Sequence, residues 1–96
     1  AVSDSSTIVN ITHHPFFNLN GCGSGTVYQH QLGINAESFL PVSEHIIPTG
    51  EIATVEQSVF DFRKYAFIGE RLVVDDVQLQ RGNGYDHCYV LHPQNE

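Results

Sequence analysis

The sequence predicts an all-β fold, as a segment of a large antiparallel β-sandwich. Several short runs rich in β-branched and aromatic residues alternate in polarity, and Gly- and Pro-containing turns separate them. The stretches between these runs are long and irregular, which suits a piece of a larger sandwich better than a compact small domain. The composition, 41% hydrophobic and 16% charged over 96 residues, is typical of a globular chain.

The first half of the chain contains two expected strands. Residues 7–12 are mostly β-branched, which favours a pleated strand. The three glycines of residues 20–25 make regular structure costly and predict a loop. Residues 27–36 alternate on one side and predict the second strand. Residues 38–51 are expected to be extended, with a turn at Pro48 and the two residues after it.

The second half is expected to hold two more strands and one short helix. Residues 58–63 alternate as a strand does. Residues 65–73 carry an apolar pair four positions apart, which predicts a short helix. The Arg-Gly-Asn-Gly of residues 81–84 predicts a tight turn, and residues 88–91 predict the final strand.

The net charge argues against two classes of binding partner. Four Lys and Arg residues stand against eleven Asp and Glu, which gives a net charge of −7. Nucleic acids and anionic membrane surfaces are bound through clustered cations, so neither is expected as a partner. No apolar run approaches the roughly 20 residues that cross a bilayer. Cys22 and Cys88 form no CxxC pair and are interpreted as ordinary thiols of a reducing compartment, which favours a cytoplasmic location.

Six histidines provide the main titratable chemistry, since histidine exchanges protons near neutral pH. His13 and His14 end the first expected strand, and Asp86 and His87 follow the Gly-Asn-Gly turn. Zinc favours the ligand atoms that these histidines and Cys88 carry. Adjacent residues of a strand point to opposite faces, however, so the spacing disfavours a shared metal ion. A metal-dependent enzyme is therefore the least favoured of the functions that we consider for this chain.

Residues 9–19, Val-Asn-Ile-Thr-His-His-Pro-Phe-Phe-Asn-Leu, resemble the Asn-Leu-Thr-Asn-His-Ser-Tyr-Phe-Asn-Leu segment of the aldose 1-epimerases, also called galactose mutarotases. Six blocks resemble this family in its own order, so the resemblance is specific and covers nearly the whole chain. It implies the family's β-supersandwich fold. The further blocks are residues 30–32 with 36–42, residues 47–52 (Ile-Pro-Thr-Gly-Glu-Ile), residues 60–63, residues 68–69 and residues 84–87 (Gly-Tyr-Asp-His).

The resemblance implies an isomerase that interconverts the α and β anomers of an aldose such as galactose or glucose. A base removes the proton of the C1 hydroxyl while an acid protonates the ring oxygen. The ring opens, the aldehyde turns about the C1–C2 bond, and the ring closes on its other face. This chemistry needs paired proton donors and acceptors and no cofactor. The expected partner is a small aldose sugar.

His14 and Asp86 match functional positions of the family, and Phe16 and Phe17 lie in the same block as His14. The resemblance makes His14 the general acid at the ring oxygen and Asp86 the carboxylate that accepts a hydrogen bond from a sugar hydroxyl. Phe16 and Phe17 could form a wall of the pocket, but core packing is the favoured role for at least one of them. The structural alternatives are a hydrogen-bonded structural role for His14 and a turn-capping role for Asp86.

The sequence also departs from the family pattern. His13 replaces the usual Asn before the catalytic histidine, Pro15 follows that histidine, and Phe16 replaces a Tyr and so lacks its hydroxyl. The catalytic position is kept, so these changes bear on substrate preference more than on reaction type. His30 and His87 match family positions too, and are expected in the core or behind the site.

Family members are considerably longer, so residues 1–96 are expected to be one part of the enzyme domain. The resemblance implies that a substrate-binding Arg and another histidine precede this segment, and that the glutamate base follows it. The segment alone is therefore expected to be inactive, with the remaining portions of the same enzyme as its partner. The alternative is a non-catalytic carbohydrate-binding module on the same scaffold.

Overall fold

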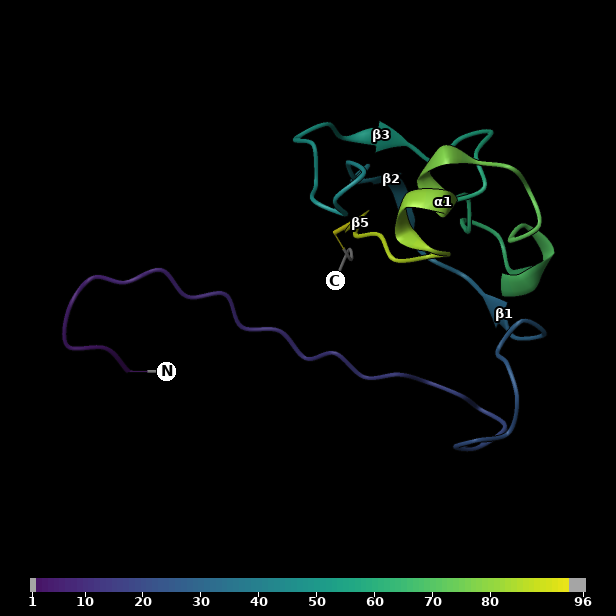
Figure 1. Cartoon of the computed structure of the whole chain (residues 1–96), viewed down its shortest axis with the longest axis horizontal. Helices are drawn as coiled ribbons and strands as arrows, with labels where there is room; N and C mark the ends of the chain where they lie inside the picture. The colour runs from purple at the N-terminus through teal and green to yellow at the C-terminus, as the bar shows by residue number, and fades with distance from the viewer. Residues whose placement is uncertain (1, 94–96) are drawn as a thin grey trace.

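The computed structural model describes residues 2–93, which form two small antiparallel sheets (Figure 1). One sheet has two strands and the other has three, with β2 at its centre. The antiparallel all-β fold class is therefore confirmed. The two-stranded sheet pairs β1 (Gln31–Leu32) with β4 (Ala66–Phe67), and the three-stranded sheet has the order β3 (Ala53–Thr54), β2 (Ala36–Phe39), β5 (Tyr89–Leu91).

The central strand β2 carries a register irregularity that sets its buried face. Phe39 lies opposite Ala53 of β3 and Tyr89 of β5. Ala36 and Phe39 are both buried, although a regular strand would turn residues three apart to opposite faces. The pairing of β2 with β5 shifts between Ala36 and Ser38, and a bulge of this kind re-aims the side chains that follow it.

The core lies between β2 and the short helix α1 (Val77–Gly82). The rings of Phe39 and Phe60 stack with their centroids 4.3 Å apart. Figure 1 shows α1 close to β2, and its Leu79 belongs to the same cluster as these two rings. Val55 is also buried there, and the half-buried partners of the cluster are Ala53, Val59, Leu72, Tyr85 and Tyr89.

The strand expected at residues 7–12 is not formed. These residues are exposed and have no regular secondary structure, and Figure 1 shows the N-terminal segment running away from the folded body. Extended backbone becomes a strand only when a neighbouring strand takes its hydrogen bonds. Among residues 2–93, no strand pairs with this segment.

The strand expected at residues 27–36 is broken in two. A turn occupies its beginning, because the amide of His30 donates to the carbonyl of Val27 at 2.9 Å. Strand β1 follows, and β2 begins only after Gly33. A Cβ on Gly33 would lie 3.1 Å from the ring of Tyr65, so the break occurs where this ring crosses the backbone. The loop expected at residues 20–25 does contain turns.

Residues 58–63 form a turn, two bends and irregular backbone instead of the expected strand. The Ser58 hydroxyl donates to the carbonyl of Val55 at 2.6 Å and accepts from the amide of Phe60 at 3.1 Å. Serine hydroxyls that bond nearby backbone groups compete with strand pairing. The alternating sequence pattern of residues 58–63 still predicts correctly which side chains are buried, because Phe60 and Phe62 are both 1% exposed.

The prediction of a helix at residues 65–73 is also wrong. Strand β4 and a 3-10 helix, η1 (Ile68–Glu70), occupy this stretch. The amides of Ile68 and Gly69 donate at 2.9 Å to the carbonyls of His30 and Tyr28, so tertiary pairing replaces helical bonds. A Cβ on Gly69 would lie 2.5 Å from the Cβ of Tyr28, so only glycine permits this approach.

The C-terminal predictions are confirmed in part. Strand β5 matches the expected strand at residues 88–91 within one residue. The expected turn at residues 81–84 begins two residues late, because Arg81 and Gly82 end α1. The chain between Val42 and Pro48 turns back on itself through one isolated antiparallel bridge. No helix within residues 2–93 has the length and hydropathy needed to cross a bilayer.

Candidate functional site

Helix α1 begins at a side-chain cap that the sequence analysis missed. The Oδ1 atom of Asp76 accepts from the amides of Gln78 and Leu79 at 2.8 and 3.2 Å. Asp is a preferred residue at this position because its carboxylate satisfies amides that have no partner inside the helix. Asp76 together with the Gly-Asn-Gly stop signal could have predicted the helix.

The end of α1 directs the chain toward Asp86. Asn83 adopts a left-handed backbone (φ 52, ψ 46), and the Gly84 amide donates to the Leu79 carbonyl at 2.8 Å. This is a C-terminal capping arrangement, and Gly84 at φ 114 can follow it because glycine lacks a Cβ. The two residues close the helix and begin the connection that carries Asp86 toward β5.

Asp86 lies between two anchored tyrosines. The Tyr85 hydroxyl donates to the carbonyl of Val59 at 2.6 Å, and the Tyr89 hydroxyl donates to the carbonyl of Phe60 at 2.9 Å. Burial raises the pKa of both phenols, so both remain protonated donors at neutral pH. The Asp86 side chain is exposed, so its carboxylate is available to accept a hydrogen bond from a ligand.

The other expected site residues lie in the exposed N-terminal segment. His14 stacks on Phe16 with ring centroids 4.8 Å apart, as residues two apart on an extended chain can. Phe16 is 89% exposed and Phe17 is 76% exposed. Figure 1 shows this segment outside the folded body, so the structure does not bring these residues to Asp86. The roles of all four residues stay predictions.

His30 fastens the end of the N-terminal segment to β1. Its Nε2 atom accepts from the amide of Leu19 at 2.9 Å. Its carbonyl accepts from the amide of Ile68 at 2.9 Å, which links the same residue to η1. The expected supporting position of His30 is therefore compatible with the structure, although no contact with a site residue defines its role.

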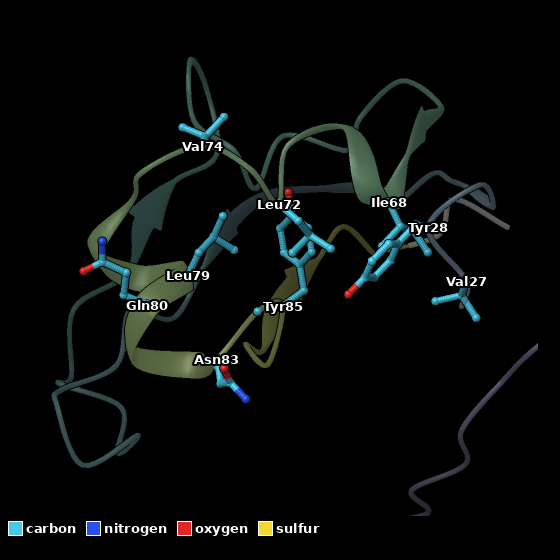
Figure 2. Close-up of a pocket in the computed structure, with 10 residues that line it drawn as sticks. Val27, Tyr28, Ile68, Leu72, Val74, Leu79, Gln80, Asn83 and Tyr85 are labelled. Atoms are coloured by element: carbon cyan, nitrogen blue, oxygen red, sulfur yellow. The ribbon is translucent and has the colours of Figure 1, made fainter. Parts of the chain in front are cut away.

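A cavity of about 490 Å³ lies beside the Asp86 turn (Figure 2). Sequence reasoning did not find it, because its wall is assembled from residues far apart in the chain. No carboxylate, histidine or cation is among the ten residues that line it, so it offers no acid–base pair. Figure 2 shows the aromatic and aliphatic part of the wall, which includes Tyr28, Ile68, Leu72, Leu79 and Tyr85.

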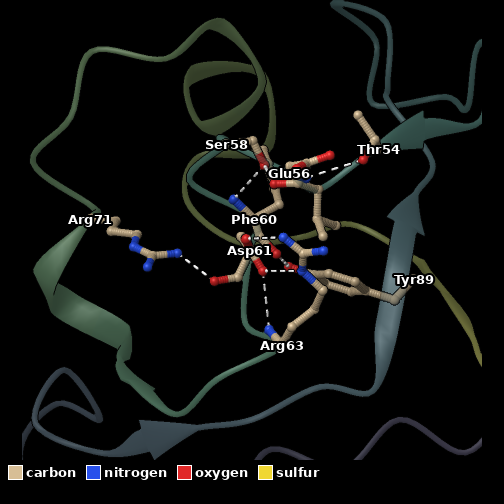
Figure 3. A network of polar contacts seen from close by, with 9 residues as sticks. Thr54, Glu56, Ser58, Phe60, Asp61, Arg63, Arg71 and Tyr89 are labelled. Atoms are coloured by element: carbon tan, nitrogen blue, oxygen red, sulfur yellow. Dashed lines mark hydrogen bonds and ion pairs between the residues drawn. The ribbon is translucent and has the colours of Figure 1, made fainter.

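Asp61 and Arg63, which follow Phe60 in the chain, form a polar network (Figure 3). Arg63 donates to both carboxylate oxygens of Asp61, at 2.9 and 2.8 Å, and Arg71 donates to the Asp61 carbonyl. The hydrogen bonds from Arg63 lower the pKa of Asp61 to about 2. Both side chains are partly exposed, at 39% for Arg63 and 24% for Asp61, and ion pairs at a protein surface contribute little to stability, so we interpret the pair as a local support for this turn.

The histidine and cysteine cluster considered for a metal is not assembled. Within residues 2–93, no group of three or more His, Cys, Asp or Glu side chains is placed to hold a metal ion. His13 and His14 are exposed in the N-terminal segment, whereas the ring of His87 packs 4.6 Å from that of Phe60. Cys22 and Cys88 are both exposed free thiols.

We expect acidification below about pH 6.5 to destabilise the fold through His87. Burial lowers the pKa of the His87 imidazole from its usual 6.5, against opposing contributions from Asp86 and Asp76. The unfolded chain therefore binds this proton at a higher pH than the folded chain, and stability falls as the pH drops. Urea unfolding of the parent and of His87→Asn at about pH 7.5 and about pH 5.5 measures this effect. Equal losses in both chains would contradict it.

A sequence model described as aldose 1-epimerase matches residues 1–96. The chain is 44% identical over 96 residues to the galactose mutarotase of Bos taurus and 38% identical to the aldose 1-epimerase of Escherichia coli strain K12. Each match covers all of this chain and 27% of the relative, so the chain spans about a quarter of the length of these relatives.

A solved structure is similar to about two thirds of the chain. The crystal structure of galactose 1-epimerase from Lactobacillus acidophilus NCFM superposes with a TM-score of 0.63 at 41% sequence identity. The superposition covers 69% of this chain and 20% of that one. The shared fold thus extends over about two thirds of the 96 residues.

Proposed function

The chain belongs to the aldose 1-epimerase family, and on that premise we propose that a protein of the family's full length containing it interconverts the α and β anomers of an aldohexose such as galactose or glucose. The observation that carries the proposal is the family match over every residue from 1 to 96. Relatives from cattle and from Escherichia coli, named galactose mutarotase and aldose 1-epimerase, agree on this class of reaction.

In the proposed mechanism, His14 is the acid. Its protonated imidazole gives a proton to the ring oxygen while a base takes the proton of the C1 hydroxyl. The bond between C1 and the ring oxygen breaks, and the C1 hydroxyl oxygen becomes the carbonyl oxygen of the open aldehyde. After rotation about the C1–C2 bond, the two proton transfers reverse and the ring closes on the other face.

The base is expected outside residues 1–96, as the family resemblance implies. Glu51 follows Pro-Thr-Gly in a block that the family uses as a loop, and it is exposed. The segment therefore supplies one half of an acid–base pair, and the rest of the domain supplies the other. We propose that residues 1–96 are part of one catalytic domain whose partner is the remainder of the same enzyme.

Asp86 is proposed to bind the sugar. Its exposed carboxylate follows Tyr85, whose hydroxyl is bonded to the carbonyl of Val59, so the turn that bears it is held in place. A carboxylate on such a turn suits a neutral polyol, because directional hydrogen bonds discriminate strongly between hydroxyl arrangements. Phe16 and Phe17 are proposed to form an apolar wall of the sugar-binding pocket, once the N-terminal segment packs against the rest of the enzyme domain.

We expect a chain of the relatives' full length containing these residues to accelerate the mutarotation of α-galactose or α-glucose, measured by polarimetry. The isolated 96-residue chain should match the rate in buffer alone, because half of the acid–base pair is missing. A rate well above buffer from the isolated chain would contradict the proposed division of the pair. Sugar binding by the full-length chain without acceleration would instead support a carbohydrate-binding module.

A further inference from the structure

The amide of Gln78 has a fixed orientation. Its Oε1 atom accepts from the amide of Val42 at 2.8 Å, and its Nε2 atom donates to the carbonyl of the same residue at 3.1 Å. A backbone N–H can only donate and a carbonyl can only accept, so these two contacts determine which end of the side-chain amide is oxygen. The carbonyl of Val42 also accepts from Arg81 at 2.9 Å. Two side chains of α1, Gln78 and Arg81, therefore hydrogen-bond to the backbone of Val42.

This orientation determines which nitrogen of His87 carries the proton. The Nε2 atom of His87 lies 3.2 Å from the Oε1 atom of Gln78, and that oxygen can only accept. Nε2 must therefore bear the hydrogen. In the neutral ring, Nδ1 is then an acceptor, and the amide of Asp86 donates to it at 3.2 Å. A single tautomer satisfies both contacts.

The ring of His87 is also held sterically. It packs edge-on against Phe60 at 4.6 Å and against Phe39 at 6.1 Å between ring centroids. A Cβ on Gly82 would lie 2.9 Å from the Cε1 atom of His87, so the end of α1 passes close to the other side. The charged groups that act on the ring are Asp86 and Asp76, and both favour its protonation.

We propose that His87 is a positioning residue that fixes the backbone of Asp86 through the bond from the Asp86 amide to His87 Nδ1, and thereby aims the Asp86 carboxylate at the sugar. The proposal rests on the proposed sugar-binding role of Asp86. The contacts form a relay in which Val42 orients Gln78, Gln78 selects the tautomer of His87, and His87 holds the Asp86 amide.

Two isosteric variants separate this role from simple packing. In His87→Asn the side-chain oxygen occupies the place of Nδ1 and can still accept from the Asp86 amide. In His87→Gln the side-chain nitrogen occupies the place of Nε2, so the bond to Gln78 survives and the Asp86 amide loses its acceptor. In a full-length chain we expect His87→Gln to raise the KM for galactose about tenfold with little change in kcat. His87→Asn should recover most of the parent KM.

Two further measurements keep the outcomes distinct. Asp86→Ala should raise KM, and adding His87→Gln to it should raise KM no further, because no carboxylate remains to be aimed. An unchanged KM in Asp86→Ala would overturn the proposed role of Asp86. A raised KM in Asp86→Ala with equal KM values in the two His87 variants would overturn the positioning role alone.

The tautomer provides a test that needs no activity. The ¹⁵N chemical shifts of the His87 ring in the full-length parent should show a protonated Nε2 and an unprotonated Nδ1 at neutral pH. A protonated Nδ1 would overturn the inference whatever the kinetics show.

Discussion

Replacing His14 with alanine in a full-length chain is expected to lower kcat for mutarotation by about 10²-fold or more. A general acid at the ring oxygen stabilises the charge that develops as the bond to C1 breaks, and alanine has no proton to supply there. The effect should fall mainly on kcat, because the proton is transferred in the transition state and not on binding. Polarimetry with α-galactose at saturating concentration measures it.

The neighbouring histidine provides a matched control. His13 is exposed like His14, and the family usually has asparagine in its place. His13→Asn should therefore retain most of the parent rate. If His14→Ala left the rate unchanged, His14 would be removed from the mechanism. Equal losses in the two variants would instead point to damage of the whole segment.

The motifs of the chain were easier to predict than its secondary structure. The blocks around His14 and Asp86 identify a family because each preserves an ordered set of side chains. Residues 7–12 have strand composition, yet they form no strand here, because pairing depends on a partner strand that local sequence does not contain. Composition therefore indicated the fold class correctly and misplaced several individual elements.

Two errors near the core have the same physical origin. The amides of Ile68 and Gly69 bond to the residues before β1, so the expected helix yielded to a contact some forty residues away in sequence. The helix that does form was missed although Asp76 offers a cap signal, because only Leu79 and Gly82 of its six residues are buried. A short helix with so small an apolar face gives little periodic signal.

The sequence predicted which residues belong to the candidate site, but it did not predict the contacts between them. Resemblance named Asp86 and suggested a supporting role for His87, but the amide bond between them depends on the orientation of Gln78. That orientation is set by Val42, which is 36 positions away. No spacing rule relates these positions, so only the structure could reveal the contact.

The same part of the molecule leads to the largest expected effect on stability, that of Phe60→Ala. Phe60 is 1% exposed, stacks on Phe39 at 4.3 Å and meets Tyr85 and His87 edge-on at 5.6 and 4.6 Å. Removing a buried phenylalanine ring costs about 3–5 kcal/mol, because the lost transfer energy adds to the cavity left behind. Small domains are stable by only about 5–15 kcal/mol, so this single change should bring the chain close to unfolding.

Urea unfolding of the 96-residue chain measures this loss against a matched control. Phe16 carries the same ring at 89% exposure, so Phe16→Ala should change the free energy of unfolding by no more than about 0.5 kcal/mol. Phe60→Leu, which keeps much of the apolar volume, should fall between the two. Equal losses from Phe60→Ala and Phe16→Ala would contradict the core assignment. Because the Phe60 ring also backs His87 and its carbonyl holds Tyr89, the same variant should loosen the turn that bears Asp86.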